Sequence, residues 1–182
     1  MLQYDDSVTF DRSTSRCCEG VELQFHYFDC VPRTDLEPID IAVDAFMEAI
    51  SNDARRWNIY NRATAKAACK KRLERAAKGE LKPVDEVKGV DEDNTAPLYE
   101  IRWQNVAVTE QSPDDPSQQV FLEVLVRMYH SEPDILPQYF VGHHVHEKVV
   151  TDGVEVYELQ DDEIAVARRK YEVGEPVTWG IG

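Results

Sequence analysis

Three strand-like runs lie in the second half of the chain, at 98–104, 120–130 and 138–148. They are rich in β-branched and aromatic residues, and segments rich in Pro, Asp and Ser separate them. Alternate residues of the central run form one wholly apolar face, made of Leu122, Val124, Val126 and Met128. Since an apolar face must be covered, we expect it to lie against helices, with the three runs as consecutive antiparallel neighbours in one sheet.

The same alternation divides the residues of the other two runs. The residues expected to face inward are Tyr99, Ile101, Trp103, Tyr139, Val141, His143 and Val145. The opposite face carries charged and proton-exchanging side chains from all three runs: Glu100, Arg102, Glu123, Arg127, Tyr129, His144, His146 and Lys148. A solvent-exposed sheet face has the same pattern, so alternation alone does not distinguish a site from an ordinary surface.

One strand and two helices are expected before these runs. Residues 21–29 alternate as in a half-buried strand, and apolar residues at helical spacing predict a helix over 39–56. Good helix formers predict a second helix over 58–78, with Gly79 placed to end it. The acidic stretch 81–97 lacks periodicity and predicts a loop.

A closing helix is indicated by its charges. Acids at Asp161, Asp162 and Glu163 and bases just before Gly174 suit the dipole of a helix between them. The separator that ends at Ser117 is long enough to be a flexible loop. We therefore expect an α+β fold: a mixed, mainly antiparallel sheet of about four strands, two N-terminal helices on one face and a C-terminal helix.

Composition favours a single domain. The chain has 182 residues, of which 42% are hydrophobic, enough for one core. We expect an N-terminal extension (1–20), the domain (21–174) and a tail (175–182). No apolar run approaches the roughly 18 residues that cross a bilayer, and the start of the chain is polar and acidic, so a cytoplasmic protein without membrane contact is expected. The cysteines form no regular framework and should be free thiols: Cys17, Cys18, Cys30 and Cys69.

Charge is unevenly distributed. The net charge of −15 argues against a nucleic-acid partner, but residues 54–82 carry ten basic residues against Glu74 and Glu80, a local charge of +8. A helix with this charge is either an ordinary solvated surface or a phosphate-binding face. The candidate RNA-binding residues are Arg62, Lys66, Lys70, Lys71 and Arg72.

The order of these elements and their residues resembles the RelE/HigB-type toxin family. The resemblance extends from Val21 to Val173, and its pieces are "RLERAAKGE" at the end of the helical pair, "LYEIRW", "VRMYH" and "FVGHHVHEK" in the three runs, and "DDEIAVARRKYE" in the closing helix. Each piece is weakly specific by itself, and the order and spacing strengthen them together. The resemblance implies a RelE/HigB-like fold.

The resemblance also implies a function. Such toxins are endoribonucleases that cut messenger RNA at the ribosome, need no metal or cofactor, and are neutralised by an antitoxin, for example of the helix-turn-helix type. Because the RNA 2′-hydroxyl is the nucleophile, the protein must orient it, exchange protons and stabilise charge. Arg127 and Arg102 match phosphate-binding arginines of the family. His144 or His146 would transfer protons, and Lys148 would stabilise charge.

Two alternatives stay open. His144 and His146 form a same-face pair that a metal ion could bind, but no further ligand completes the set, so we expect no metal site. The second alternative is a catalytically inactive RelE-like binding module, which binds a partner or mimics nucleic acid with its acidic surface. An enzyme predicts that Arg102, Arg127 and a His or Lys converge on one concave face, whereas a binding module predicts that this face is covered or neutralised by acids such as Glu100.

Overall fold

Within the described residues, five strands form one sheet between helices. The computed structural model describes residues 14–31, 33–90, 97–148 and 155–182, with only the backbone for 155–159. Its elements are η1 (Arg16–Cys18), β1 (Gln24–Tyr27), α1 (Pro38–Ala49), α2 (Ile59–Ala77), β2 (Val87–Gly89), β3 (Leu98–Gln111), β4 (Gln119–Ser131), β5 (Tyr139–Lys148), α3 (Glu155–Gly174) and η2 (Glu175–Gly180). The sheet order is β1-β5-β4-β3-β2, in which β1 is parallel to β5 and all other neighbours are antiparallel. The chain therefore has the predicted α+β class with a mixed, mainly antiparallel sheet.

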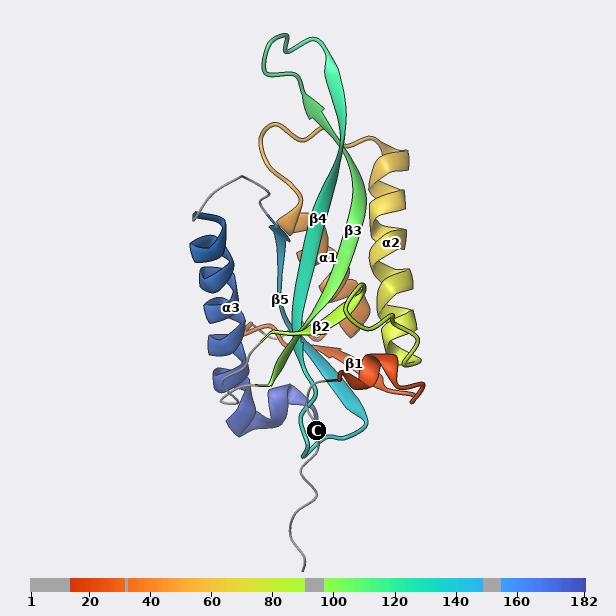
Figure 1. The fold of residues 1–182 in the computed structure, drawn as a ribbon, viewed down its shortest axis with the longest axis vertical. Coiled ribbons are helices and arrows are strands. Elements are labelled where there is room, and N and C mark those ends of the chain that lie inside the picture. The colour runs from red at the N-terminus through yellow and green to blue at the C-terminus, as the bar shows by residue number, and fades with distance from the viewer. Residues whose placement is uncertain (1–13, 32, 91–96, 149–154) are drawn as a thin grey trace, which may run out of the picture.

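The helices cover both faces of this sheet (Figure 1). α1 packs on β1 and β5, and α2 packs on β3 from the same side, as predicted for the two N-terminal helices. α3 packs on β4 and β5 from the other side. The polar sheet face that the sequence predicted is therefore the face on which α3 lies.

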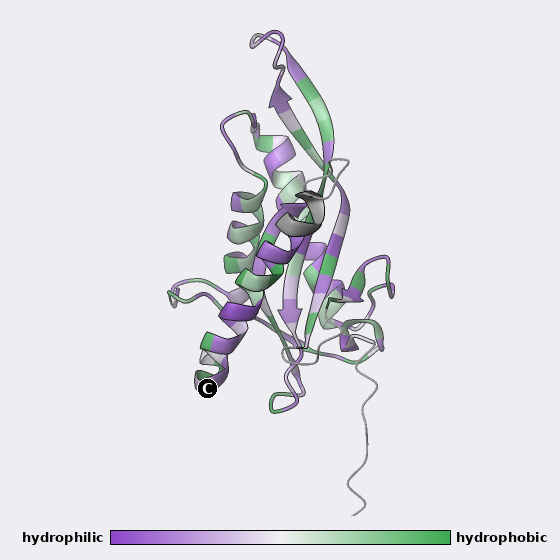
Figure 2. Cartoon of the chain, turned by 60° about the vertical axis from the view of Figure 1, so that its left-hand side comes forward, coloured by the Kyte–Doolittle hydropathy of each residue, from purple (hydrophilic) through white to green (hydrophobic). Residues whose placement is uncertain are grey.

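The central hairpin is longer than expected. The three runs are consecutive antiparallel neighbours, as predicted, but β3 and β4 stay paired up to Gln111 and Gln119. The segment between the first two runs was predicted to be a long flexible loop, and this prediction was wrong. An irregularity between Trp103 and Val106 restores the alternation of buried and exposed side chains, so that β3 continues beyond it. Figure 2 shows polar and apolar residues alternating along this hairpin.

The first helix is shorter than predicted and the second agrees. α1 ends at Ala49 and not near Arg56, because the Asn52 side chain accepts hydrogen bonds from the backbone N–H groups of Ala54 and Arg55 and so stabilises a turn. α2 begins behind a capping box formed by Asn58. Its predicted stripe is buried: Ala65, Cys69, Leu73 and Ala76.

Two further predictions needed correction. The stretch 81–97 was expected to be a loop, yet it contains β2, which pairs with β3 and gives the sheet its fifth strand. Residues 91–96 of that stretch lie outside the described residues. The closing helix begins at Glu155, so Asp161, Asp162 and Glu163 lie inside it and not at its start.

The inward and outward sides of β5 also differ from the prediction. Between the pairs Tyr129–His144 and His130–Gly142 the register shifts by a residue, so β5 bulges at His143. Val145 faces α1 and α2 as predicted, but Val141 and His143 belong to the α3 side, where His143 contacts the Tyr171 ring. A bulge reverses the alternation beyond it, and this is why the prediction failed there.

The residues before β1 pack on the domain. Cys17 is fully buried in the core between helices and sheet, and the η1 segment contacts α2. Gly79 ends α2 with a φ of +66°, as predicted, and a Cβ there would lie 2.6 Å from the backbone nitrogens of Gly20 and Val21. The four cysteines are free thiols, as expected. Among the described residues, every helix is too short or too polar to cross a bilayer.

Candidate functional site

The polar face of the sheet brings most of the predicted catalytic residues together. Across β3, β4 and β5, Arg102 is opposite Arg127, and Arg127 is opposite His146. One step along, Glu100, Tyr129 and His144 form the next row. Because facing residues of neighbouring antiparallel strands have Cβ atoms about 4.5–5.5 Å apart, the predicted convergence of two arginines and a histidine is present.

A buried carboxylate lies close to both arginines and offsets one of their two charges. Glu100 accepts hydrogen bonds from Nε and Nη2 of Arg102, and its Oε2 lies 3.8 Å from Nε of Arg127. Glu100 and Arg127 expose only 4% and 5% of their surface. Nη1 of Arg127 donates to the carbonyl oxygens of Val126 and Trp103, at 3.0 and 3.4 Å. Burial lowers the pKa of Arg127, and the Glu100 charge opposes that shift. Nη1 of the guanidinium that should grip phosphate is thus bonded to the protein's own carbonyl groups, and its buried Nε has no hydrogen-bond partner within the described part of the chain.

The histidines continue this enclosed cluster. Nε2 of His146 lies 3.2 Å from the Tyr129 hydroxyl, and the two rings stack with centroids 5.3 Å apart. Burial lowers the pKa of His146 and raises that of Tyr129, so at neutral pH the imidazole is uncharged and the phenol keeps its proton. Nε2 of His144 is bonded to the Glu163 carboxylate of α3. Proton exchange between these groups is feasible, but α3 lies over them.

Lys148 is the one predicted catalytic residue that lies outside this cluster. It is half-buried at the end of β5, opposite Leu125 and two residues beyond His146. The arrangement therefore holds Arg102, Arg127, His144 and His146 in one cluster with Lys148 at its edge. Chemically it is a network of hydrogen bonds and ion pairs in which Arg127 is buried and Arg102 is partly exposed.

The predicted RNA-binding residues separate into two groups. Lys70 forms an ion pair with Asp40 of α1, 2.7 Å away, on the side of α2 away from β3. Arg62 and Lys71 are exposed and Lys66 is half-buried. Arg72 donates to the Arg102 carbonyl and lies 3.4 Å from the Glu86 carboxylate. Only part of the predicted basic face is therefore available to a ligand.

A groove between α2 and β3 contains the available part. Its basic half has a volume of about 330 Å³ and is lined by Ala68, Lys71, Arg72, Arg75, Trp103, Gln104, Asn105 and Val106. Nearer the start of α2 lies a second hollow of about 410 Å³, which includes Asn61 and Thr64 of the helix and Phe121 of β4. Phe121 is 81% exposed. Cations and amides line the first hollow and an exposed ring lines the second, and these two kinds of group suit a ligand that carries both phosphates and bases.

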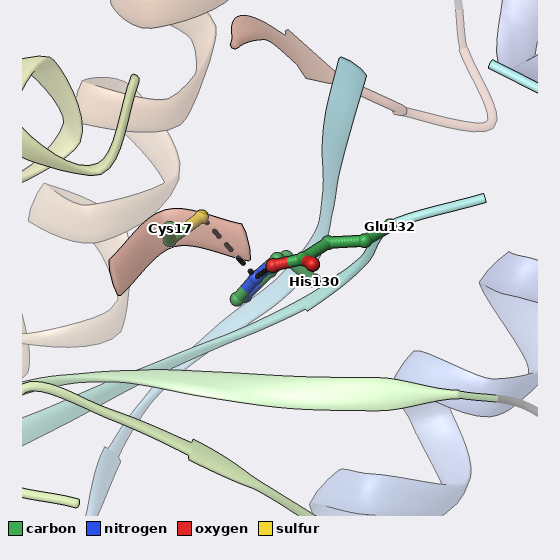
Figure 3. A group of neighbouring side chains, drawn as sticks. All are labelled: Cys17, His130 and Glu132. Carbon is green, nitrogen blue, oxygen red and sulfur yellow. Dashed lines mark hydrogen bonds and ion pairs between the residues drawn. The ribbon is translucent and has the colours of Figure 1, made fainter. Parts of the chain in front are cut away.

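A third group of side chains was not predicted from the sequence. Cys17 of η1, His130 of β4 and Glu132, which follows the end of β4, lie together in the interior (Figure 3). Nε2 of His130 lies 3.7 Å from Sγ of Cys17 and 3.1 Å from Oε1 of Glu132. Burial and the Glu132 charge raise the pKa of Cys17 well above its usual value. Burial alone would raise the pKa of Glu132, but hydrogen bonds from His130 and Ser15 lower it to about 2. The pattern His-x-Glu at a strand end was a possible signal, but the cysteine comes from a segment interpreted as an extension.

Models of known protein families, curated proteins and solved structures gave no match to this chain.

Proposed function

We propose that this chain is a cytoplasmic RelE/HigB-like binding module that holds single-stranded RNA in the groove between α2 and β3 and does not cleave it. The observation that carries the proposal is the Glu100 carboxylate, which pairs with Arg102 and lies close to the buried Arg127. The order of elements, one strand and two helices before four antiparallel strands and a helix, supports the RelE/HigB likeness, although β2 is a strand that the resemblance did not predict.

The groove supports RNA as the ligand. Lys71 is exposed at its basic half, and Gln104 and Asn105 offer amides beside it. Phe121 provides an exposed ring on which a base can stack, which is sequence-tolerant because every base has a π-face. The local charge of +8 in residues 54–82 is partly offset by ion pairs with Asp40, Glu86, Glu110 and Glu147. The exposed Arg62 and Lys71 remain to attract phosphates.

Neighbouring lysines provide the test. Fluorescence anisotropy with a labelled single-stranded RNA should show binding by the wild-type chain that weakens as salt rises. Lys71→Ala should weaken it and reduce the slope of log affinity against log salt by about 0.7, the value for one phosphate contact on a single strand. Lys70→Ala is the matched control and should leave both unchanged, because Lys70 is paired with Asp40. Absent binding by the wild-type chain, or equal effects of the two changes, would overturn the proposal.

A second candidate is the endoribonuclease toxin held in check by an antitoxin. The row Arg102, Arg127 and His146 favours it, because two guanidiniums and an imidazole meet as RNA cleavage requires. This candidate needs the buried Arg127 to become exposed before RNA can reach it. Expression without a partner, followed by growth curves and gel analysis of cellular RNA, separates the two: growth arrest with cut RNA, abolished by Arg127→Ala in a folded chain, would favour the toxin.

A further inference from the structure

Three ligand-type atoms of different chemistry converge inside the domain, away from the polar sheet face and the α2 groove. Sγ of Cys17, Nε2 of His130 and a carboxylate oxygen of Glu132 all lie within 4.8 Å of one another (Figure 3). Cys17 and His130 are fully buried, and Glu132 is 7% exposed. The fold joins them from positions more than 110 residues apart, since η1 lies against the end of β4.

The distances match the edges of a metal coordination tetrahedron. Zinc binds a thiolate sulfur at about 2.3 Å and an imidazole nitrogen at about 2.0 Å, so these two ligands are about 3.5 Å apart. A nitrogen and a carboxylate oxygen on the same ion are about 3.3 Å apart. The observed separations are 3.7 Å from Cys17 to His130 and 3.1 Å from His130 to Glu132. Little movement is needed for all three atoms to bind one ion.

The geometry does not suit a cysteine nucleophile. In a catalytic cysteine–histidine–acid arrangement, the two ring nitrogens of the histidine serve different partners. Here the sulfur of Cys17 and the carboxylate of Glu132 both meet Nε2 of His130, which carries at most one proton. A single cation satisfies both contacts at once, because sulfur, nitrogen and oxygen all present lone pairs to it.

Surrounding groups hold the carboxylate in place. Ser15 Oγ donates to Oε1 of Glu132 at 2.5 Å, and the backbone N–H of Arg16 donates to Oε2 at 2.8 Å. Groups that orient a ligand in this way are typical of metal sites. A cavity of about 560 Å³, lined in part by Glu132, Arg16 and Tyr99, reaches the cluster from the surface. The cavity brings solvent to the Glu132 side of the cluster, whereas Cys17 and His130 are fully buried behind it.

We propose that Cys17, His130 and Glu132 bind one zinc-type divalent ion, with water in the fourth position. On binding, the S–H bond of Cys17 breaks and its proton leaves to solvent, and the proton that His130 donates from Nε2 to Glu132 moves to Nδ1, so that the Nε2 lone pair is free for the ion. The sulfur–metal and nitrogen–metal bonds then link η1 to the end of β4. The ion thereby fixes the start of the domain to its central strand.

Cobalt is the probe for this site. The purified chain is stripped with a chelator and titrated with Co²⁺, and the expected result is uptake of an equimolar amount with a thiolate-to-cobalt charge-transfer absorption. Zn²⁺ should displace the cobalt and raise the melting temperature. Cys17→Ser should abolish the charge-transfer band, and the adjacent Cys18→Ser is the matched control that keeps it, because Cys18 Sγ points to the Ser15 carbonyl.

A second variant covers the case in which Cys17→Ser does not fold. Glu132→Gln keeps the size of the side chain but loses the charge and one of the two oxygens that accept from Ser15 and Arg16, and it should weaken cobalt affinity roughly tenfold or more. Circular dichroism of each variant confirms that it is folded. The proposal is overturned if the wild-type chain takes up no equimolar cobalt, if the folded Cys17→Ser variant keeps the absorption, or if Glu132→Gln binds as tightly as the wild type.

Discussion

Removing the charge of Glu100 should destabilise the domain strongly. Oε2 of Glu100 lies 3.8 Å from Nε of Arg127, which corresponds to an attraction of about 4 kcal/mol at an effective dielectric constant of ~20. In Glu100→Gln that attraction is lost and two guanidiniums remain side by side, while the avoided desolvation of the carboxylate offsets part of the loss. The expected decrease in the free energy of unfolding is about 3 kcal/mol, and the melting temperature should fall by roughly 6–12 °C.

Urea unfolding followed by circular dichroism measures this change. Glu123→Gln is the matched control. Glu123 is an exposed residue of β4, and among the described side chains it is hydrogen-bonded only to Asn105. Its replacement should change the free energy of unfolding by less than about 0.5 kcal/mol. A decrease below about 1 kcal/mol for Glu100→Gln, or one no larger than that of the control, would refute the idea of a closed, neutralised sheet face. Arg127 would then be accessible to solvent, as a nuclease requires.

Three further outcomes are expected. Burial lowers the pKa of His143 to about 3. The free energy of unfolding should therefore be greatest above about pH 6.5 and fall by up to ~1.4 kcal/mol per pH unit towards pH 3. In urea titrations at several pH values, His143→Gln should show a smaller dependence of this free energy on pH. Gly79→Ala should cost at least about 2 kcal/mol, since its φ is +66° and its Cβ would collide with backbone, whereas Gly89→Ala, with open space around it, should cost far less by the same assay. Arg55→Ala should lower stability by about 3 kcal/mol, because the buried guanidinium bridges the carboxylates of Glu110 and Glu147, and thermal melts check this.

Periodicity predicted the elements where one face is strictly apolar. Val126 and Met128 meet the helices as expected, and the buried stripe of α2 includes Cys69 and Leu73. The prediction failed where a single polar residue or irregularity decides the path. Asn52 ends α1 early through its side chain, and the irregularity after Trp103 lengthens the hairpin. Such local competition depends on contacts that a hydrophobic pattern does not contain.

The sequence predicted which residues lie together in the candidate site, but not whether solvent can reach them. Alternation placed Arg102, Arg127 and His146 on one face, and the register brings them together. Whether such a face is open depends on where the closing helix packs, and its sequence permits either side. The cluster of Cys17 and His130 was missed because it joins the two ends of a long stretch of chain, a relation that no spacing in the sequence indicates.

The bulge of β5 at His143 links these features. By reversing the alternation it places His143 and His144 on the same side of the sheet, so that one ring packs against Tyr171 of α3 and the other bonds to Glu163 of the same helix. A regular strand would direct only one of the two toward α3. His143 and His144 therefore serve, in this arrangement, as attachment points for α3 on the polar sheet face, and movement of α3 away from the sheet must expose the uncharged, buried His143 to water.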